Sequence, residues 1–283
     1  MSSRIHESGF DTLGTHYLRL GDADAPTILF IHGLGMAHMY WQPQLVALAE
    51  RYHLIAYDLL GHGESPPPDD DVTLDDLVDQ AHGLLHDLGV QTAHIVGHSM
   101  GGLIATGFAL AHPQASLSLS VLNSVYDRPL EARRAAEERA SQILANTADT
   151  RRDNGVEATI VRWFGDTPDV EHEELIDMLR QQLAANDPAQ YGQIYRLFAT
   201  SDVAFVGRLQ ALTCPALFMT GADDPNSTPA MSQRMADAAP HGHCIVFDDA
   251  RHMMSLVDPA RVTPELDEFI STVGSASTRG AAS

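Results

Sequence analysis

Lysine is absent from this sequence of 283 residues, and all 17 of its Lys-plus-Arg residues are arginine. Without lysine the chain cannot form a pyridoxal Schiff base, use a lysine nucleophile or supply the lysine of a phosphate-binding P-loop. Arginine is itself outnumbered, because 38 acidic residues give a formal net charge of −21. A surface this acidic repels phosphate backbones and anionic lipids, so we expect no nucleic-acid partner and no membrane binding. Small-molecule chemistry is the remaining expectation.

Cysteine and long apolar segments are also scarce. Cys214 and Cys244 are the only cysteines, too few for a disulfide framework, which favours a reducing compartment. No segment approaches the ~18 consecutive apolar residues of a membrane-spanning helix, and residues 1–7 lack the apolar core of a signal peptide. We therefore expect a cytoplasmic protein. Its 44% of hydrophobic residues is typical of a globular chain with a large buried core.

Short apolar segments of strand length alternate with segments of helical character. The strand segments are continuously apolar, which indicates strands covered on both faces, and their alternation with helices predicts a mostly parallel, doubly wound α/β sheet. Strands are predicted at 26–31, 53–57, 93–96, 117–122, 216–219 and 244–247. Helices are predicted between them at 41–52, 73–88 and 101–112. Thr73 is the expected N-cap of the second helix, and two short segments before residue 21 can supply an antiparallel edge.

The segment from residue 124 to 202 interrupts this alternation. Its periodicity predicts helices only, at 130–145, 156–164, 171–185 and 189–198. An all-helical insertion between two strands predicts a lid, which divides the chain into a core of residues 1–123 and 203–271 and a lid of residues 124–202. Nine of the 17 arginines lie between residues 126 and 202, so we expect the lid to repel anions less than the rest of the surface. Residues 272–283, rich in Ser, Gly and Ala, predict a disordered tail.

The segment Gly97-His98-Ser99-Met100-Gly101 lies between a predicted strand and a predicted helix. A nucleophile elbow requires this context, in which a serine hydroxyl is raised above the carboxyl end of the sheet. The glycines two residues either side of Ser99 avoid side chains that so tight a turn cannot hold. The N–H groups at the start of the helix then face the reaction centre. The pattern predicts Ser99 as a nucleophile, with an ordinary turn and an exposed serine as the alternative.

A serine nucleophile needs a histidine base that is itself held by a carboxylate. In a sheet of this kind the chain order is serine, acid, histidine. His252 is the only histidine after the last predicted strand, so we predict it as the base. Asp223 and Asp224 both lie in the loop after the strand at 216–219, and the pattern alone leaves either of them as the acid.

The loop His32-Gly33-Leu34-Gly35 follows the first long strand. Its glycines let the backbone approach a substrate closely, so we expect the backbone N–H groups of Leu34 and Met100 to form the oxyanion hole. His32 is expected to make structural hydrogen bonds. His241 and His243 lack further ligands at suitable spacing, so we expect a polar turn there and no metal site.

Three motifs occur in a fixed order along the chain: His32-Gly33-Leu34-Gly35, then Asp58-Leu59-Leu60-Gly61-His62-Gly63-Glu64-Ser65, then Gly97-His98-Ser99-Met100-Gly101-Gly102. Together they resemble the α/β-hydrolase superfamily over about residues 5–270, which implies the α/β-hydrolase fold. In that family the acid commonly lies three residues after the glycine that ends its strand, which favours Asp224. Serine at position 99 differs from the aspartate nucleophile of haloalkane dehalogenases and epoxide hydrolases, which argues against those activities.

Two segments of the predicted lid, Arg162-Trp163-Phe164 and Tyr195-Arg196-Leu197-Phe198-Ala199, resemble the lids of 3-oxoadipate enol-lactonases and related esterases. The resemblance implies a serine hydrolase of a small carboxylic ester or lactone that needs no metal or organic cofactor. Trp163, Phe164, Tyr195 and Phe198 are expected in its pocket, although aromatic residues on lid helices can equally be plain core. The alternatives are a meta-cleavage-type C–C hydrolase, a non-haem haloperoxidase and a hydrolase-fold receptor that binds its ligand.

Overall fold

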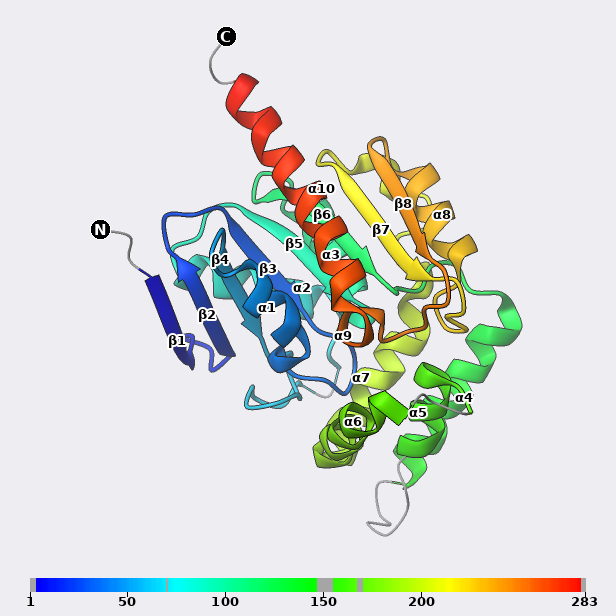
Figure 1. The fold of residues 1–283 in the computed structure, drawn as a ribbon. Coiled ribbons are helices and arrows are strands. Elements are labelled where there is room, and N and C mark those ends of the chain that lie inside the picture. The colour runs from blue at the N-terminus through cyan, green and yellow to red at the C-terminus, as the bar shows by residue number, and fades with distance from the viewer. Residues whose placement is uncertain (1–3, 70, 147–154, 167–169, 281–283) are drawn as a thin grey trace.

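Eight strands form one sheet in the computed structural model of the chain (Figure 1). The structure describes residues 4–69, 71–146, 155–166 and 170–280. Across the sheet the strands follow the order β1-β2-β4-β3-β5-β6-β7-β8. Their bounds are β1 Arg4–Phe10, β2 His16–Asp22, β3 Thr27–Ile31, β4 His53–Tyr57, β5 Ala93–His98, β6 Ser116–Leu122, β7 Ala216–Gly221 and β8 Gly242–Phe247.

The strands from β3 to β8 run parallel to one another, whereas β2 pairs antiparallel with both β1 and β4. The antiparallel edge predicted from the first 21 residues is therefore present. Both β3 and β4 are buried along their whole length, as continuous apolarity predicts. Successive side chains of β3 point to opposite faces, so Ile28 and Phe30 enter one hydrophobic core and Leu29 and Ile31 the other.

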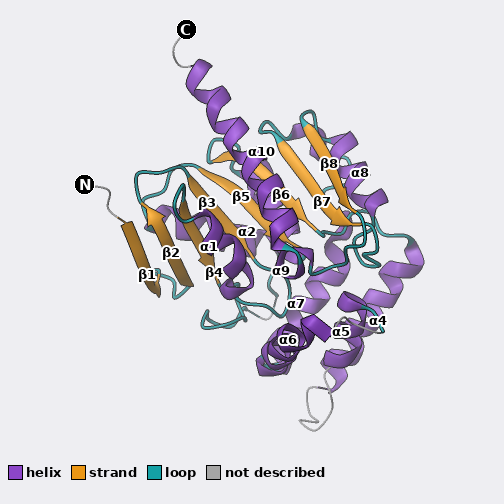
Figure 2. Cartoon of the chain, in the orientation of Figure 1, coloured by secondary structure: helices purple, strands orange, loops and turns teal. Residues whose placement is uncertain are grey.

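Helices cover both faces of the sheet (Figure 2). One face packs against α2 (Leu74–Asp87), α3 (Met100–Ala111) and α8 (Pro229–Ala238). The other packs against α1 (Gln42–Leu48), α9 (Met254–Val257) and α10 (Pro259–Gly280). Thr73 caps α2 as predicted, because its hydroxyl accepts a hydrogen bond from the N–H of Asp76. The doubly wound α/β arrangement expected from the sequence is confirmed.

In the described ranges, four α-helices between β6 and β7 lie beyond the carboxyl ends of the parallel strands (Figure 1). They are α4 (Leu130–Asn146), α5 (Val156–Phe164), α6 (Glu173–Ala185) and α7 (Pro188–Thr200). Helix α4 packs on α7, and α5 packs on α6. The first pair joins the core shared with α2 and α3, whereas the second joins the core shared with α1 and α10. The insertion thus extends both cores past the edge of the sheet where the candidate site lies.

The end of the chain differs from the sequence-based expectation. Helix α10 continues to Gly280, so residues 272–280 extend the last helix where we predict a disordered tail. No proline follows Pro264 to end that helix, and Ser and Ala are tolerated in helices. Residues 281–283 of the predicted tail lie outside the described residues. Within the described ranges, no helix has the length and apolarity needed to cross a membrane.

Candidate active site

Ser99 lies at the sharp turn between β5 and α3. Its backbone has φ 54° and ψ −115°, a φ that residues with side chains seldom adopt. A Cβ atom at Gly97 would lie 2.1 Å from the carbonyl oxygen of Gly101, and one at Gly101 would lie 2.2 Å from that of Ile31. Only glycine fits at both positions, so the turn has the geometry that the glycine pattern predicts. The Ser99 hydroxyl does not cap its own helix and so stays available to other groups.

His252 lies between Ser99 and Asp224. Its Nε2 is 3.2 Å from Ser99 Oγ, and its Nδ1 is 2.8 Å from Asp224 Oδ2. The three residues follow β5, β7 and β8, whose carboxyl ends meet at one edge of the sheet. All three side chains are buried. With its proton on Nδ1, the imidazole donates to Asp224 and leaves Nε2 free to accept from the Ser99 hydroxyl.

Asp224 rather than Asp223 contacts His252. The Asp223 residue is exposed, whereas Asp224 is buried. Asp224 Oδ2 also accepts hydrogen bonds from Ser227 Oγ at 2.6 Å and from Asn123 Nδ2 at 2.8 Å. Burial opposes ionisation of this carboxyl, yet His252 and these donors together hold the pKa of Asp224 below its usual value. Asp224 is therefore a buried carboxylate aimed at one imidazole.

Asn123 and Ser227 are residues of this site that the sequence reasoning misses. Asn123 comes directly after β6 with φ 49°, and Ser227 Oγ lies 3.4 Å from His252 Nδ1. A signal for Asn123 exists in the sequence, because it is a polar residue directly after the predicted strand at 117–122. Carboxyl ends of neighbouring parallel strands lie side by side, so that position adjoins the loop that carries Asp224.

His32 fixes the start of the loop that contains Leu34. Its Nδ1 donates to the carbonyl of Gly33 at 2.8 Å, and its Nε2 accepts from the N–H of Leu59 at 3.0 Å. Burial lowers the pKa of His32 to about 3, so the ring is neutral and can accept that hydrogen bond. These contacts agree with the structural role expected for His32.

Gly35 fixes the other end of the same loop. Its N–H donates to His62 Nε2 at 2.9 Å, and its carbonyl accepts from Asn186 Nδ2 at 3.1 Å. Leu34 itself lines the cavity above Ser99. Met100 is the first residue of α3, where N–H groups have no partner within the helix and carry partial positive charge. Leu34 thus lies on the cavity of Ser99 in a fixed loop, and Met100 follows Ser99 directly at the start of α3.

A cavity of about 510 Å³ contains Ser99 and His252 and is of the size that small ligands occupy. Trp163, Tyr195 and Phe198 line it, and the Trp163 ring stacks against His252 with centroids 6.0 Å apart. Phe164, which we expect in the same pocket, lines a separate cavity of about 420 Å³. The reason is helical geometry, because adjacent residues of α5 point roughly 100° apart.

Comparison with known proteins decides the family. Residues 26–259 match the alpha/beta hydrolase fold family, which is more than half of the chain. The chain belongs to the α/β-hydrolase family. The fold and the family that the sequence motifs indicate are both confirmed.

Relatives of this α/β hydrolase act on small molecules. An Acinetobacter baylyi (E)-2-((N-methylformamido)methylene)succinate hydrolase is 36% identical over 258 residues, covering 91% of this chain and 94% of the relative. An A. baylyi 3-oxoadipate enol-lactonase is 30% identical over 256 residues, covering 89% and 91%. The crystal structure of the Burkholderia xenovorans enol-lactonase superposes with a TM-score of 0.80 at 23% identity, covering 94% of this chain and all of that one, which shows the shared fold. The chain is a hydrolase with small substrates.

In this α/β hydrolase, His98 joins the elbow to the loop that carries His252. Its Nε2 donates to the carbonyl oxygen of His252 at 2.9 Å, and its ring stacks on Tyr40 with centroids 4.5 Å apart. Burial lowers the pKa of His98 to about 3. Within the described ranges its Nδ1 has no hydrogen-bond partner, so a second proton would be buried without an acceptor. His98 is therefore a neutral tie between the two loops.

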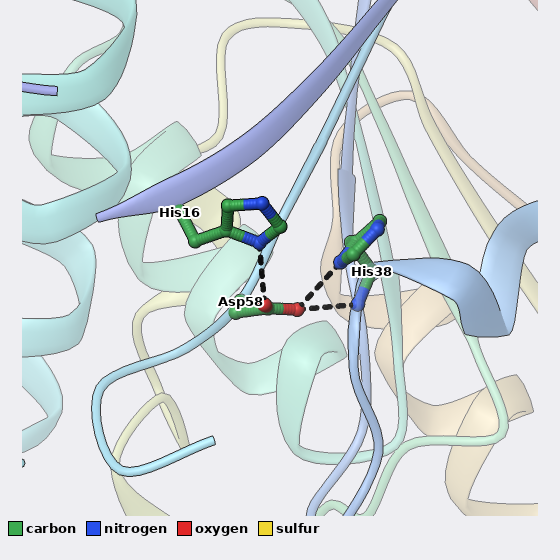
Figure 3. Close-up of side chains that lie close together, drawn as sticks. All are labelled: His16, His38 and Asp58. Atoms are coloured by element: carbon green, nitrogen blue, oxygen red, sulfur yellow. Dashed lines mark hydrogen bonds and ion pairs between the residues drawn. The ribbon is translucent and has the colours of Figure 1, made fainter. Parts of the chain in front are cut away.

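A second buried carboxylate of the α/β hydrolase lies between two histidines (Figure 3). Asp58 Oδ2 accepts from His16 Nδ1 at 2.9 Å, and Oδ1 accepts from His38 Nδ1 at 2.9 Å and from the His38 backbone N–H at 2.7 Å. These three residues are the one cluster in the described part of the chain with metal-ligating types in reach of one another. Each Nδ1 that donates to Asp58 carries a proton there and has no lone pair for a metal. The contacts are those of a hydrogen-bonded structural cluster.

Proposed function

We propose that this chain is a serine hydrolase that cleaves a small carboxylic ester or lactone, with Ser99 as nucleophile, His252 as base and Asp224 as the acid that orients it. The observation that carries the proposal is the continuous hydrogen-bonded series from Ser99 Oγ through His252 to Asp224 beside a cavity of about 510 Å³. Acyl transfer to serine requires a hydroxyl, a base and a carboxylate in this order.

In the first half of the proposed reaction, Ser99 Oγ attacks the carbonyl carbon while His252 Nε2 takes the hydroxyl proton. Asp224 accepts a hydrogen bond from Nδ1 and stabilises the imidazolium that forms. The tetrahedral intermediate then breaks its bond to the alcohol oxygen, which receives the proton from His252. The products are a free alcohol, or the opened hydroxyl end of a lactone, and an acyl-enzyme on Ser99.

The backbone N–H groups of Leu34 and Met100 bind the oxyanion in this proposal. Support comes from the fixed loop around Leu34 and from the position of Met100 at the first turn of α3. Preorganised donors of this kind stabilise charge that develops only in the transition state. In the second half, water attacks the acyl carbon with His252 as base again, and the acid leaves as Ser99 regains its proton.

The names of the relatives support this class of substrate. One of them is an enol-lactonase, so its name describes opening of a lactone, and the other is named for a formamido-substituted succinate. Esters, lactones and amides all react with a serine nucleophile through an oxyanion at the carbonyl carbon. The proposal for this chain is an ester or lactone, and amide substrates are a comparison in its test.

The test joins labelling with a substrate panel. We expect a fluorophosphonate probe to label Ser99 and to abolish turnover of p-nitrophenyl esters and small lactones by the purified chain. Peptide mass spectrometry locates the label, and kcat/KM ranks esters, lactones and anilides. Ester turnover that persists after labelling, or a label that maps elsewhere, contradicts the proposal.

The other candidate activities give different results in the same panel. Greater kcat/KM for a meta-cleavage diketone acid than for any ester or lactone indicates a C–C hydrolase. Oxidation that depends on peroxide and halide, with no ester turnover, indicates a haloperoxidase. Saturable binding of an ester or lactone without turnover indicates a receptor. Each of these outcomes replaces the proposed function.

A further inference from the structure

Four arginine side chains line the cavity that contains Ser99 and His252: Arg128, Arg139, Arg162 and Arg234. No Asp or Glu is among the described residues that line this cavity, although the chain has 38 acidic residues and a net charge of −21. The sign of the charge is therefore reversed locally. Charges of one sign in a low-dielectric cavity concentrate their potential there, which favours an anionic ligand.

Two of the four arginines already hold protein groups. Arg128 is buried, with Nη1 3.6 Å from Asp202 Oδ1 and in a hydrogen bond to the carbonyl of Ala199 at 3.2 Å. Arg234 donates to the carbonyl of Tyr126 at 3.0 Å. Their donors tie the segment after β6 to α7 and α8. These two side chains have a structural use.

Among the described residues, the other two arginines have polar contacts but no counter-ion. Arg162 Nη2 donates to Thr159 Oγ1 at 2.7 Å, and Arg139 Nε donates to the Tyr195 hydroxyl at 3.1 Å. Neither guanidinium forms an ion pair with a carboxylate anywhere in the described ranges. Burial lowers the pKa of Arg162, and the neighbouring charge of Arg139 acts in the same direction. A half-buried cation that faces a second cation and no anion is costly unless a ligand supplies the missing charge.

We propose that Arg139 and Arg162 bind a free carboxylate of the substrate, so that the preferred substrate is an ester or lactone that carries a second, ionised carboxyl group. This inference rests on the proposed function, because it takes the cavity beside Ser99 as the reaction chamber. Planar guanidinium groups bind carboxylates through paired N–H donors and are more specific for them than a point charge. Among the described residues, no hydrogen bond uses the remaining N–H donors of either side chain.

The two arginines come from different helix pairs of the insertion. Arg139 belongs to α4 and Arg162 to α5, and these helices belong to the two separate pairs, α4 with α7 and α5 with α6. A carboxylate between the guanidinium groups removes their repulsion and links the pairs across the cavity. An internal Asp or Glu at this place would neutralise the same charge and abolish the preference for an anionic substrate.

The test compares two esters that differ only in charge at the far end of the acyl chain. Mono-p-nitrophenyl adipate carries a carboxylate where p-nitrophenyl hexanoate carries a methyl group. We expect wild type to prefer the adipate, and Arg162→Gln and Arg139→Gln each to reduce the adipate-to-hexanoate ratio of kcat/KM by roughly 10- to 100-fold, as loss of a charge-assisted hydrogen bond does. Arg180→Gln is the matched control, because Arg180 lies on α6 and is already paired with Glu157. We expect that control to leave the ratio unchanged.

A binding measurement separates this inference from the catalytic proposal. Calorimetric titration of adipate into Ser99→Ala needs no turnover, and we expect Arg162→Gln in that background to weaken binding by roughly 10- to 100-fold. Thermal unfolding checks the fold, and removal of an unpaired cation should not lower the midpoint.

Two outcomes then have distinct meanings. An unchanged adipate-to-hexanoate ratio of kcat/KM in both arginine variants overturns the carboxylate subsite. If Ser99→Ala also loses hydrolysis of both esters, the proposed function still stands. Adipate binding that depends on Arg162 in a chain whose ester turnover survives Ser99→Ala supports the subsite and overturns the proposed function.

Discussion

The hydrogen-bonded series of Ser99, His252 and Asp224 has a close counterpart elsewhere in the fold. Ser8, His16 and Asp58 form a second hydrogen-bonded series. Ser8 Oγ lies 2.9 Å from His16 Nε2, and His16 Nδ1 lies 2.9 Å from Asp58 Oδ2. The corresponding distances at Ser99 are 3.2 and 2.8 Å. In both series a serine hydroxyl contacts a histidine, and that histidine contacts a carboxylate, at the distances found in catalytic serine, histidine and aspartate sets.

The surroundings of the two serines differ. Ser99 has a left-handed φ of 54° and is followed by the first turn of α3, beside a cavity. Ser8 is exposed on the edge strand β1, with no helix after it, and lines neither of the two cavities beside Trp163. A hydrogen-bonded series supplies only proton transfer, whereas the elbow supplies oxyanion donors and the cavity holds the substrate. We infer chemistry at Ser99 and structure at Ser8.

The two carboxylates also have different uses. Asp224 holds one histidine, whereas Asp58 accepts from His16 and His38 and from the backbone N–H of Glu64 at 3.1 Å. Asp58 thus ties β2, the segment before α1 and the loop after β4 to one another. Asp58 is a structural acceptor, because neither His16 nor His38 lines the cavity that contains Ser99.

The largest effect that separates the series is loss of the nucleophile. We expect Ser99→Ala to reduce kcat for ester hydrolysis by on the order of 10⁶-fold, as removal of a triad serine does. Ser8→Ala, the matched control, should leave kcat unchanged. Steady-state kinetics on both variants makes the comparison, and a loss at Ser8 similar to that at Ser99 would show that the hydrogen-bonded series alone defines catalysis.

The next effect concerns the acid. Asp224→Asn should reduce kcat by roughly 10⁴-fold, because the imidazole loses the charge that holds its tautomer and stabilises its protonated form. Asp223→Asn changes an exposed neighbour with no contact to His252 and is expected to change kcat little. A larger loss from Asp223→Asn than from Asp224→Asn would reverse the assignment of the acid.

A smaller effect concerns Asp58 and is measured as a change in the stability of the fold. Asp58→Asn should lower the free energy of unfolding by on the order of 3 kcal/mol, because buried donors from two histidines lose their charged acceptor. Burial opposes ionisation, but the hydrogen bonds and nearby histidines hold the pKa of Asp58 below its usual value. The contribution is therefore present above about pH 4 and is lost as the pH falls below the pKa of the unfolded carboxyl. Urea unfolding at pH 7 and pH 3 measures it, and an equal loss at both pH values contradicts this origin.

Local sequence predicts the parts of the molecule whose geometry is itself local. The elbow needs only residues 97 to 101, and the start of α2 needs only Thr73 and Asp76, so both can be predicted from residues close together in the sequence. The strands β3 and β4 follow from continuous apolarity. By contrast, the composition of residues 272–280 favours a tail, whereas the structure continues α10, whose Leu266 is anchored in the core shared with α1.

The rest of the site depends on contacts between distant segments. Asn123 and Asp224 are 101 positions apart, so no local pattern shows that one holds the other. Trp163 lines both cavities, whereas the next residue, Phe164, lines only the second, in part because the direction of α5 is set by its packing on α6. The family resemblance favours Asp224 over Asp223, whereas the strand-and-loop pattern permits both.

The smallest effect is on the pH dependence of stability and comes from two buried, neutral histidines. His98 lies beside the Ser99 series, and His32 lies beside the Ser8 series. His98 donates to the carbonyl of His252, and His32 accepts from the N–H of Leu59, which adjoins Asp58. Burial lowers the pKa of both rings to about 3. The unfolded chain takes up a proton at each ring below about pH 6.5 while the folded chain does not, so acid favours unfolding. Each ring should therefore cost about 1.4 kcal/mol of stability per pH unit between pH 6 and pH 4.

Glutamine keeps an amide donor and acceptor but cannot titrate, so His98→Gln and His32→Gln should each reduce that slope by one proton. The measurement is the free energy of unfolding in urea at pH 6, 5 and 4, with His86→Gln as the control because the His86 ring is 83% exposed. Equal reductions at His98 and His32 mean that burial alone keeps both rings neutral, whichever series they adjoin. A slope that stays at its wild-type value in both variants contradicts neutral burial. A smaller reduction at His98 would mean that the neighbouring Asp224 charge already favours protonation there, and so would tie the acid response to the active site.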